Sequence, residues 1–124
     1  MVPTDNPHQI DVYDFVLPFS GRLDPSIQWV QLAQRMPWEE LGTQYAQCFS
    51  ATQGRPALAP RIAIGAVLIQ QMKGVTDTET VQEIRENPYL QYFLGYPDYC
   101  YRQCCDPSLL VTIRRRLGPD LIAQ

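Results

Sequence analysis

The sequence lacks the apolar segments that would direct a chain to or across a membrane. Its most apolar stretch, residues 62–69, is followed at once by Gln70, Gln71 and Lys73. No run therefore approaches the ~20 apolar residues of a transmembrane helix. The first residues, MVPTDNPHQID, also lack the basic and then apolar regions of a secretory signal. We expect a cytoplasmic protein with no membrane partner.

Histidine is nearly absent, and the common catalytic motifs are missing. The single histidine, His8, lies close to the N-terminus, and there is no G-x-S-x-G, no glycine-rich phosphate loop and no H-E-x-x-H. Carboxylates do cluster, at Glu39 and Glu40 and over residues 77–86. Acids are ordinary in the first turn of a helix and on a solvated helix face. We therefore expect no catalytic residue and no cofactor in this chain.

Four cysteines are present, Cys48, Cys100, Cys104 and Cys105. In a chain without an export signal, reducing conditions favour free thiols over disulfides. A zinc site built on the last three is the alternative, but C-x3-C-C is not a common ligand spacing. We expect buried or partly buried thiols and no metal site.

The remaining composition is that of one folded domain. A chain of 124 residues with 45% hydrophobic residues can fill a single core. The net charge of −3 opposes general binding to phosphate backbones. Basic residues nevertheless gather toward the C-terminus, where residues 100–124 carry four Arg and two Asp. Any DNA contact should therefore be local.

An extended arm is expected over residues 1–23, which hold three prolines and a Ser20–Gly21 turn signal. Its apolar side chains are too many for a solvated tail, so part of the arm should lie across the body of the protein. These side chains are Val12, Phe15, Val16, Leu17 and Phe19.

Proline and capping residues indicate two helix starts in the first half of the chain. Asp24–Pro25 combines a strong N-cap with a residue favoured in the first turn, and predicts a helix that ends before Pro37. Pro37 opens a second helix, in which apolar residues recur at helical spacing as far as Phe49.

A central buried helix is expected over residues 60–73, because this segment is apolar on most sides. Gly74 should end it in a left-handed cap. The pattern Thr76-x-x-Glu79 is a capping box and opens a fourth helix, which extends to about Glu86.

Two further starts complete the predicted fold. Asn87–Pro88 opens a short aromatic helix over residues 89–94, and Asp106–Pro107 opens a sixth helix that stops at Gly118. Six helix starts without a convincing strand pair predict an all-α fold, a compact bundle of about six short helices. The helical domain should span residues 24–118.

This bundle could contain a helix-turn-helix-like unit. Residues 60–73, the Gly74–Thr76 turn and residues 77–86 have the required order. However, the predicted fourth helix carries four acids against one arginine, Arg85, and should repel phosphate in a major groove. We do not expect it to be a recognition helix.

The last predicted helix contains three consecutive arginines, Arg114, Arg115 and Arg116. At 100° per residue they cover roughly 200–300° of the helix circumference, so they cannot all face one groove. They either contact phosphates, or are solvated or paired with acids such as Glu83 and Glu86.

Five segments closely resemble the N-terminal domain of InsH-type insertion-sequence transposases. They are GRLDP at 21–25, WVQLAQRMPWEEL at 29–41, GRPALAPRIAIGAVLI at 54–69, GVTDTETVQEIRENPYLQYFLG at 74–95 and DPSLLVTIRRRLG at 106–118. The resemblance spans nearly the whole chain, and its last two segments are the most specific.

This resemblance implies a non-catalytic module of a DNA transposase. In the family, a ribonuclease-H-like domain follows and uses three carboxylates and divalent metal ions to cut and join DNA. Residues 119–124 would begin that missing domain or the linker to it, and the catalytic carboxylates have no matching positions here. The implied partner is the double-stranded terminal inverted repeat. The basic residues expected to contact it are Arg55, Arg61, Arg102, Arg114, Arg115 and Arg116.

The alternative is a subunit-assembly module with little DNA affinity of its own. Its support is the acidic first half of the chain and an apolar surplus around Phe15, Trp29 and Trp38, which would form a dimer patch. Self-association is expected under both hypotheses.

Overall fold

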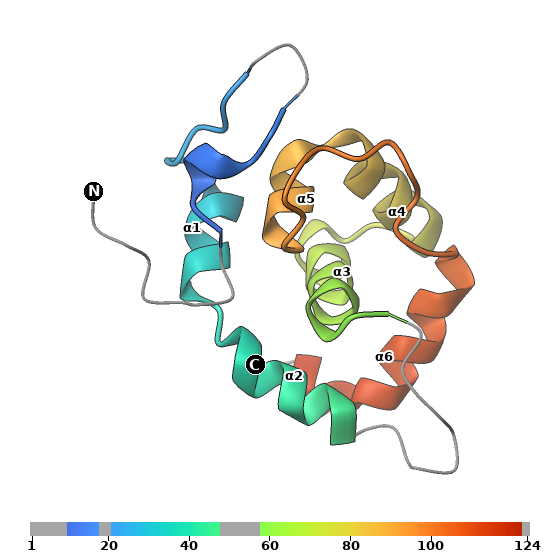
Figure 1. Cartoon of the computed structure of the whole chain (residues 1–124). Helices are drawn as coiled ribbons and strands as arrows, with labels where there is room; N and C mark the ends of the chain where they lie inside the picture. Colours follow the sequence, from blue (N-terminus) through green and yellow to red (C-terminus); the bar gives the residue numbers. More distant parts are fainter. Residues whose placement is uncertain (1–9, 18–20, 48–57, 123–124) are drawn as a thin grey trace.

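The computed structural model describes residues 10–17, 21–47 and 58–122, with side chains as far as residue 116. These residues form six α-helices and one short 3-10 turn (Figure 1), and they contain no β-strand beyond a single isolated bridge between Val16 and Asp98. The predicted all-α fold is confirmed. The elements are η1 (Val12–Asp14), α1 (Gln28–Arg35), α2 (Trp38–Gln47), α3 (Pro60–Lys73), α4 (Asp77–Glu86), α5 (Pro88–Phe93) and α6 (Pro107–Ile122).

Helix α3 is the central helix, as its composition predicted. It contacts α2, α4 and α6, and Figure 1 shows it in the middle of the molecule with the other helices around it. Gly65 on α3 faces α5 so closely that an added Cβ would overlap with Leu94. The buried residues of α3 are Ala63, Ile64, Gly65, Ala66, Val67, Ile69 and Gln70.

The turn between α3 and α4 follows the predicted capping signals. Gly74 adopts the left-handed conformation, with φ 66° and ψ 39°, and its N–H donates to the Gln70 carbonyl at 2.8 Å. In the capping box, the Glu79 N–H donates to Thr76 Oγ1 and the Thr76 N–H donates to Glu79 Oε1, both at 3.1 Å. These bonds satisfy backbone groups that a helix end leaves without partners.

Asp24 does not cap α1, so the predicted start of this helix was wrong. The Asp24 carboxylate accepts hydrogen bonds from the Ser26 N–H at 2.9 Å and the Ser26 hydroxyl at 2.7 Å. This local turn competes with the helix, which begins only at Gln28, after an extended Ile27.

The predicted end of α6 was also wrong. The helix continues through Gly118 to Ile122. A glycine ends a helix where it takes the left-handed conformation, whereas Gly118 remains helical. The second helix is described as far as Gln47, so its predicted continuation to Phe49 lies outside the described residues.

The described part of the N-terminal arm lies against the body of the protein, as predicted. Val12 and Phe15 are buried. The Phe15 ring packs edge to face on the Tyr92 ring of α5, with 5.9 Å between the ring centres. The Tyr92 hydroxyl donates to the Ile10 carbonyl at 2.8 Å. Val16 differs from the expectation, because it is 63% exposed. Phe19 lies outside the described residues.

None of the helices in the described ranges is long and apolar enough to cross a membrane.

Candidate functional site

Helix α6 carries most of the predicted basic residues, and its orientation decides which of them are accessible. It packs against α3 and α4 and buries Leu110 and Ile113. Successive residues of a helix are rotated by 100° about its axis. Arg114 and Arg115 therefore point in directions that differ from each other and from that of the buried Ile113.

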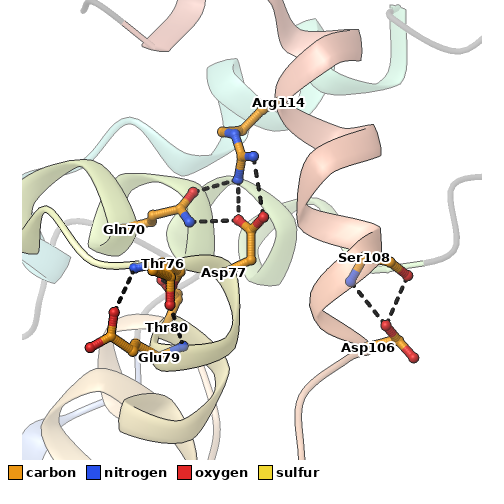
Figure 2. A network of polar contacts seen from close by, with 8 residues as sticks. All are labelled: Gln70, Thr76, Asp77, Glu79, Thr80, Asp106, Ser108 and Arg114. Atoms are coloured by element: carbon orange, nitrogen blue, oxygen red, sulfur yellow. Dashed lines mark hydrogen bonds and ion pairs between the residues drawn. The ribbon is translucent and has the colours of Figure 1, made fainter.

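Arg114 points inward to a polar network between three helices (Figure 2). It forms a two-pronged ion pair with Asp77 at the start of α4, and it also donates to Gln70 Oε1 at 2.6 Å. Gln70 Nε2 in turn donates to Asp77 Oδ1 at 2.5 Å. The network joins α3, α4 and α6, so Arg114 is engaged in holding the bundle together.

The acid that pairs with Arg114 differs from those expected. Arg114 pairs with Asp77, whereas Glu83 pairs with Lys73 at 3.2 Å and Glu86 accepts a hydrogen bond from Gln82. Sequence reasoning missed the Asp77 partner because the two residues are brought together by the packing of α6 on α4. Local spacing carries no signal for that contact.

Arg114 also sets the charge state of its partner. Hydrogen bonding from the Arg114 guanidinium, with a contribution from Gln70, holds the pKa of the Asp77 carboxyl below its ordinary value of 3.8. A carboxylate with a depressed folded-state pKa stabilises the protein above its unfolded-state pKa, and that contribution is lost as the pH falls through the folded-state pKa.

We expect the variant Asp77→Asn to be less stable than the wild type by about 1 kcal/mol at pH 7, since the ion pair is partly solvated. The difference should shrink as the pH is lowered below 3.8, where wild-type Asp77 takes up its proton. Urea unfolding followed by circular dichroism at pH 7 and at successively lower pH measures both quantities. Asp98→Asn on the exposed loop is the matched control and should change stability little at any pH. A D77N penalty that is constant with pH would contradict the ion-pair assignment.

The outward face of α6 forms an exposed stripe, which we call the α6 stripe. It consists of Ser108, Val111, Thr112 and Arg115, all exposed and spaced at three, one and three residues. This spacing places them on one side of the helix. The α6 stripe contains no acidic residue, and its cation is Arg115. Arg116, the next residue, is partly exposed.

Two other predicted arginines have different environments. Arg102 lies exposed in the loop before α6. Arg61 is partly buried, because its Nε donates to the Phe93 carbonyl at 3.0 Å and its guanidinium lies 4.4 Å from the centre of the Trp38 ring. Burial lowers the pKa of Arg61 to about 10. Arg61 therefore holds the C-terminal end of α5 against α3.

The structure thus separates the six predicted arginines. Arg115 and Arg102 are exposed, Arg116 is partly exposed, and Arg114 and Arg61 are engaged in contacts within the protein. Arg55 lies outside the described residues.

A buried glutamine that the sequence did not single out holds the loop between α5 and α6. Gln91 is fully buried on α5. Its amide nitrogen donates to the Cys100 carbonyl at 2.9 Å and to the Ile84 carbonyl at 3.0 Å, and its amide oxygen accepts from the Cys100 N–H at 2.8 Å. This side chain ties the loop that carries Arg102 to the end of α4. A glutamine among aromatic residues carries no distinctive pattern, so sequence reasoning had no signal for it.

The helix-turn-helix-like order is present in α3, the turn and α4, but the outward side of α4 is acidic. Glu79 and Glu86 are exposed, and Glu83 is partly exposed. Each of them makes a contact within the protein. Glu79 belongs to the capping box, Glu86 accepts a hydrogen bond from Gln82, and Glu83 pairs with Lys73. Such a surface repels phosphate, and the expectation that α4 is not a recognition helix stays a prediction.

The carboxylates and thiols of the described segments do not gather into a group of three or more His, Cys, Asp or Glu that could hold a metal ion. Cys100, Cys104 and Cys105 are free thiols and partly buried.

Comparison with known proteins relates residues 18–116 to the family described as transposase domain (DUF772). The chain is also similar to an uncharacterized protein, ORF8 in the nfe locus of Rhizobium meliloti, with 32% identity over 106 residues. That match covers 82% of this chain and 51% of the relative, so the chain spans about half of the relative's length. No solved structure matches the chain significantly.

Proposed function

Because this chain belongs to the transposase domain family, we propose that it is a non-catalytic module that binds double-stranded transposon-end DNA through the α6 stripe. The observation that carries the proposal is the exposure of Arg115 on a helix face without acids. Arginine and hydroxyl side chains are the usual partners of DNA phosphates. The α6 stripe offers Arg115 and the Thr112 hydroxyl, whereas the Ser108 hydroxyl donates to the Asp106 carboxylate at 2.8 Å.

The electrostatic surroundings favour a small footprint. Helix α4 packs against α6, and its outer side is acidic. Phosphates that approach α6 from the α4 side would therefore be repelled. Arg102 in the preceding loop and Arg116 extend the basic surface beyond Arg115. We therefore propose contacts with few phosphates, which predicts a shallow dependence of affinity on salt.

The proposal assigns DNA cleavage and joining to a separate domain. The exposed acids of α4 cap a helix or pair with neighbouring side chains, and these contacts account for their positions without a catalytic role.

We expect the variant Arg115→Ala to weaken binding to the inverted-repeat end and to lower the slope of log affinity against log salt by about 1, because one phosphate contact is lost. Fluorescence anisotropy with the inverted-repeat duplex and a scrambled duplex, at several salt concentrations, measures both effects. Arg35→Ala is the matched control, because Arg35 is exposed on α1 and the charge change is identical.

Two results would count against this assignment. Arg115→Ala could bind with wild-type affinity and slope, or Arg35→Ala could lose as much affinity as Arg115→Ala. Either result would show that the α6 stripe is not the DNA contact.

The alternative function, subunit assembly, was based on an apolar surface around Phe15, Trp29 and Trp38, and these side chains do not form an exposed patch. Phe15 and Trp38 are 3% and 5% exposed, and the Trp29 ring packs on the Phe93 ring with 5.2 Å between the ring centres. These aromatic residues belong to the core and its margin. Self-association through another surface stays a prediction. Sedimentation velocity showing a dimer, together with no binding to either duplex, would favour assembly as the main role.

A further inference from the structure

Two adjacent thiols face each other at the start of α6. The sulfur atoms of Cys104 and Cys105 lie 3.6 Å apart, and both side chains are partly exposed. Neighbouring side chains along an extended chain usually point to opposite sides. The short distance therefore reflects a loop conformation that turns both thiols toward the same point. The loop is tied to the body by Gln91 through Cys100.

A direct disulfide between these residues is unfavourable. Consecutive Cα atoms are about 3.8 Å apart across a trans peptide, whereas disulfides usually need Cα atoms about 4.4–6.8 Å apart. An atom that bonds to both sulfurs avoids this strain, because the sulfurs can stay farther apart than in an S–S bond. The pair is therefore better suited to a bridging ligand than to oxidation.

The two thiols are also unequal in acidity. The hydrogen bond between the two sulfurs lowers the pKa of Cys104 and, together with burial, raises the pKa of Cys105. A thiolate is the nucleophilic form of cysteine. Cys104 would therefore attack first, and Cys105 would complete the bridge.

We propose that Cys104 and Cys105 form a two-thiol binding site for monosubstituted trivalent arsenicals. In the reaction, an arsenical R–As=O accepts two sulfur atoms, so two As–S bonds form and the As=O bond breaks. The two thiol protons leave with the oxygen as water. Arsenic stays trivalent, and neither sulfur is oxidised.

The number of available thiols selects this class of ligand. Within the described ranges, no third His, Cys, Asp or Glu joins the pair to form a metal-holding group. Structural zinc requires four ligands, and an arsenic atom without an organic substituent would require a third sulfur. An arsenical that already carries one organic group has two positions left, which two thiols fill.

The site can be tested by intact-protein mass spectrometry with phenylarsine oxide at equimolar concentration in excess glutathione. All proteins carry Cys48→Ser, so that this thiol does not contribute. We expect one adduct per chain, which a small dithiol removes. Because the second thiol acts within the same chain, Cys104→Ser and Cys105→Ser should each need about tenfold more arsenical or show no adduct.

Cys100→Ser is the matched control and should keep the full adduct. Circular dichroism verifies that each variant is helical, and Cys104→Ala and Cys105→Ala replace any serine variant that is not. An adduct that persists in the Cys104 and Cys105 variants, or that is lost in Cys100→Ser, would overturn the proposal. DNA binding is measured separately on the same samples, so failure of the thiol site and failure of the proposed DNA role are distinguishable.

Discussion

Replacing Gln91 with leucine is expected to lower the free energy of unfolding by about 3 kcal/mol. Leucine has a similar size but can neither donate nor accept, so beside the fully buried position 91 it leaves the partly buried Cys100 carbonyl and N–H without their partner. Each buried polar group without a partner costs about 1–3 kcal/mol. The Ile84 carbonyl at the end of α4 loses its side-chain donor as well.

This change should appear in two measurements. The melting temperature followed by circular dichroism should fall by about 10 °C or more for a domain of this size. Hydrogen exchange should accelerate at the Cys100 amide, which donates to Gln91 in the wild type. Exchange at this amide reports on the loop itself, whereas the melting temperature reports on the whole domain.

The matched control is Gln82→Leu on α4, where an exposed amide bonds to Glu86 within the same helix. Exposed substitutions usually change stability by no more than about 0.5 kcal/mol. If Gln91→Leu behaved like Gln82→Leu, Gln91 would not hold the loop in place. The proposed DNA contact would then have to be reconsidered for Arg102, whose loop depends on this side chain.

A second large effect is expected for Gly65→Ala on α3, which should destabilise the protein by about 2 kcal/mol. The new methyl group would overlap with Leu94, and its other near neighbour is the Phe93 ring, at 3.6 Å. Leu94 and Phe93 are both buried, so they can move only by disturbing the core. Chemical denaturation with urea measures the loss.

Gly42→Ala on α2 is a matched control with the opposite expected sign. Among the described residues, an added Cβ there meets Pro60 alone, at an ordinary contact distance of 3.5 Å. Replacing a glycine inside a helix by alanine stabilises by roughly 0.5–1 kcal/mol when space is available. Two identical substitutions in two helices should therefore change stability in opposite directions.

A double variant tests the stated cause of the Gly65 effect. Leu94→Val removes part of the side chain that the new methyl group would strike. The combination of Gly65→Ala and Leu94→Val should be less destabilised than the sum of the two single variants, since the residues are in contact. Simple additivity would mean that the clash with Leu94 is not the source of the loss.

Helix starts and ends that depend on local chemistry were predictable. The Thr76–Glu79 capping box, the left-handed Gly74 and the Asn87 cap all use residues within four positions of each other. Such bonds form from neighbouring groups whatever the rest of the chain does. The same logic failed at Asp24, because a competing turn with Ser26 satisfies the same carboxylate.

The candidate site was only partly predictable. The basic character of the last helix was evident from three consecutive arginines, but their different roles were not. Arg114 reaches Asp77, which is 37 positions away in the chain, and Arg61 reaches the Phe93 carbonyl, 32 positions away. No local spacing carries information about such pairs.

By itself, the sequence determined the family, the all-α class and the start of the central helix, because motifs and helix caps act over a few residues. Only the tertiary structure decided the rotation of α6. Burial of Leu110 and Ile113 against the other helices turns Arg114 toward Asp77 and leaves Arg115 outside. The physical reason is that successive helical residues differ by 100°, so the packing of one apolar face determines which neighbouring charge meets solvent.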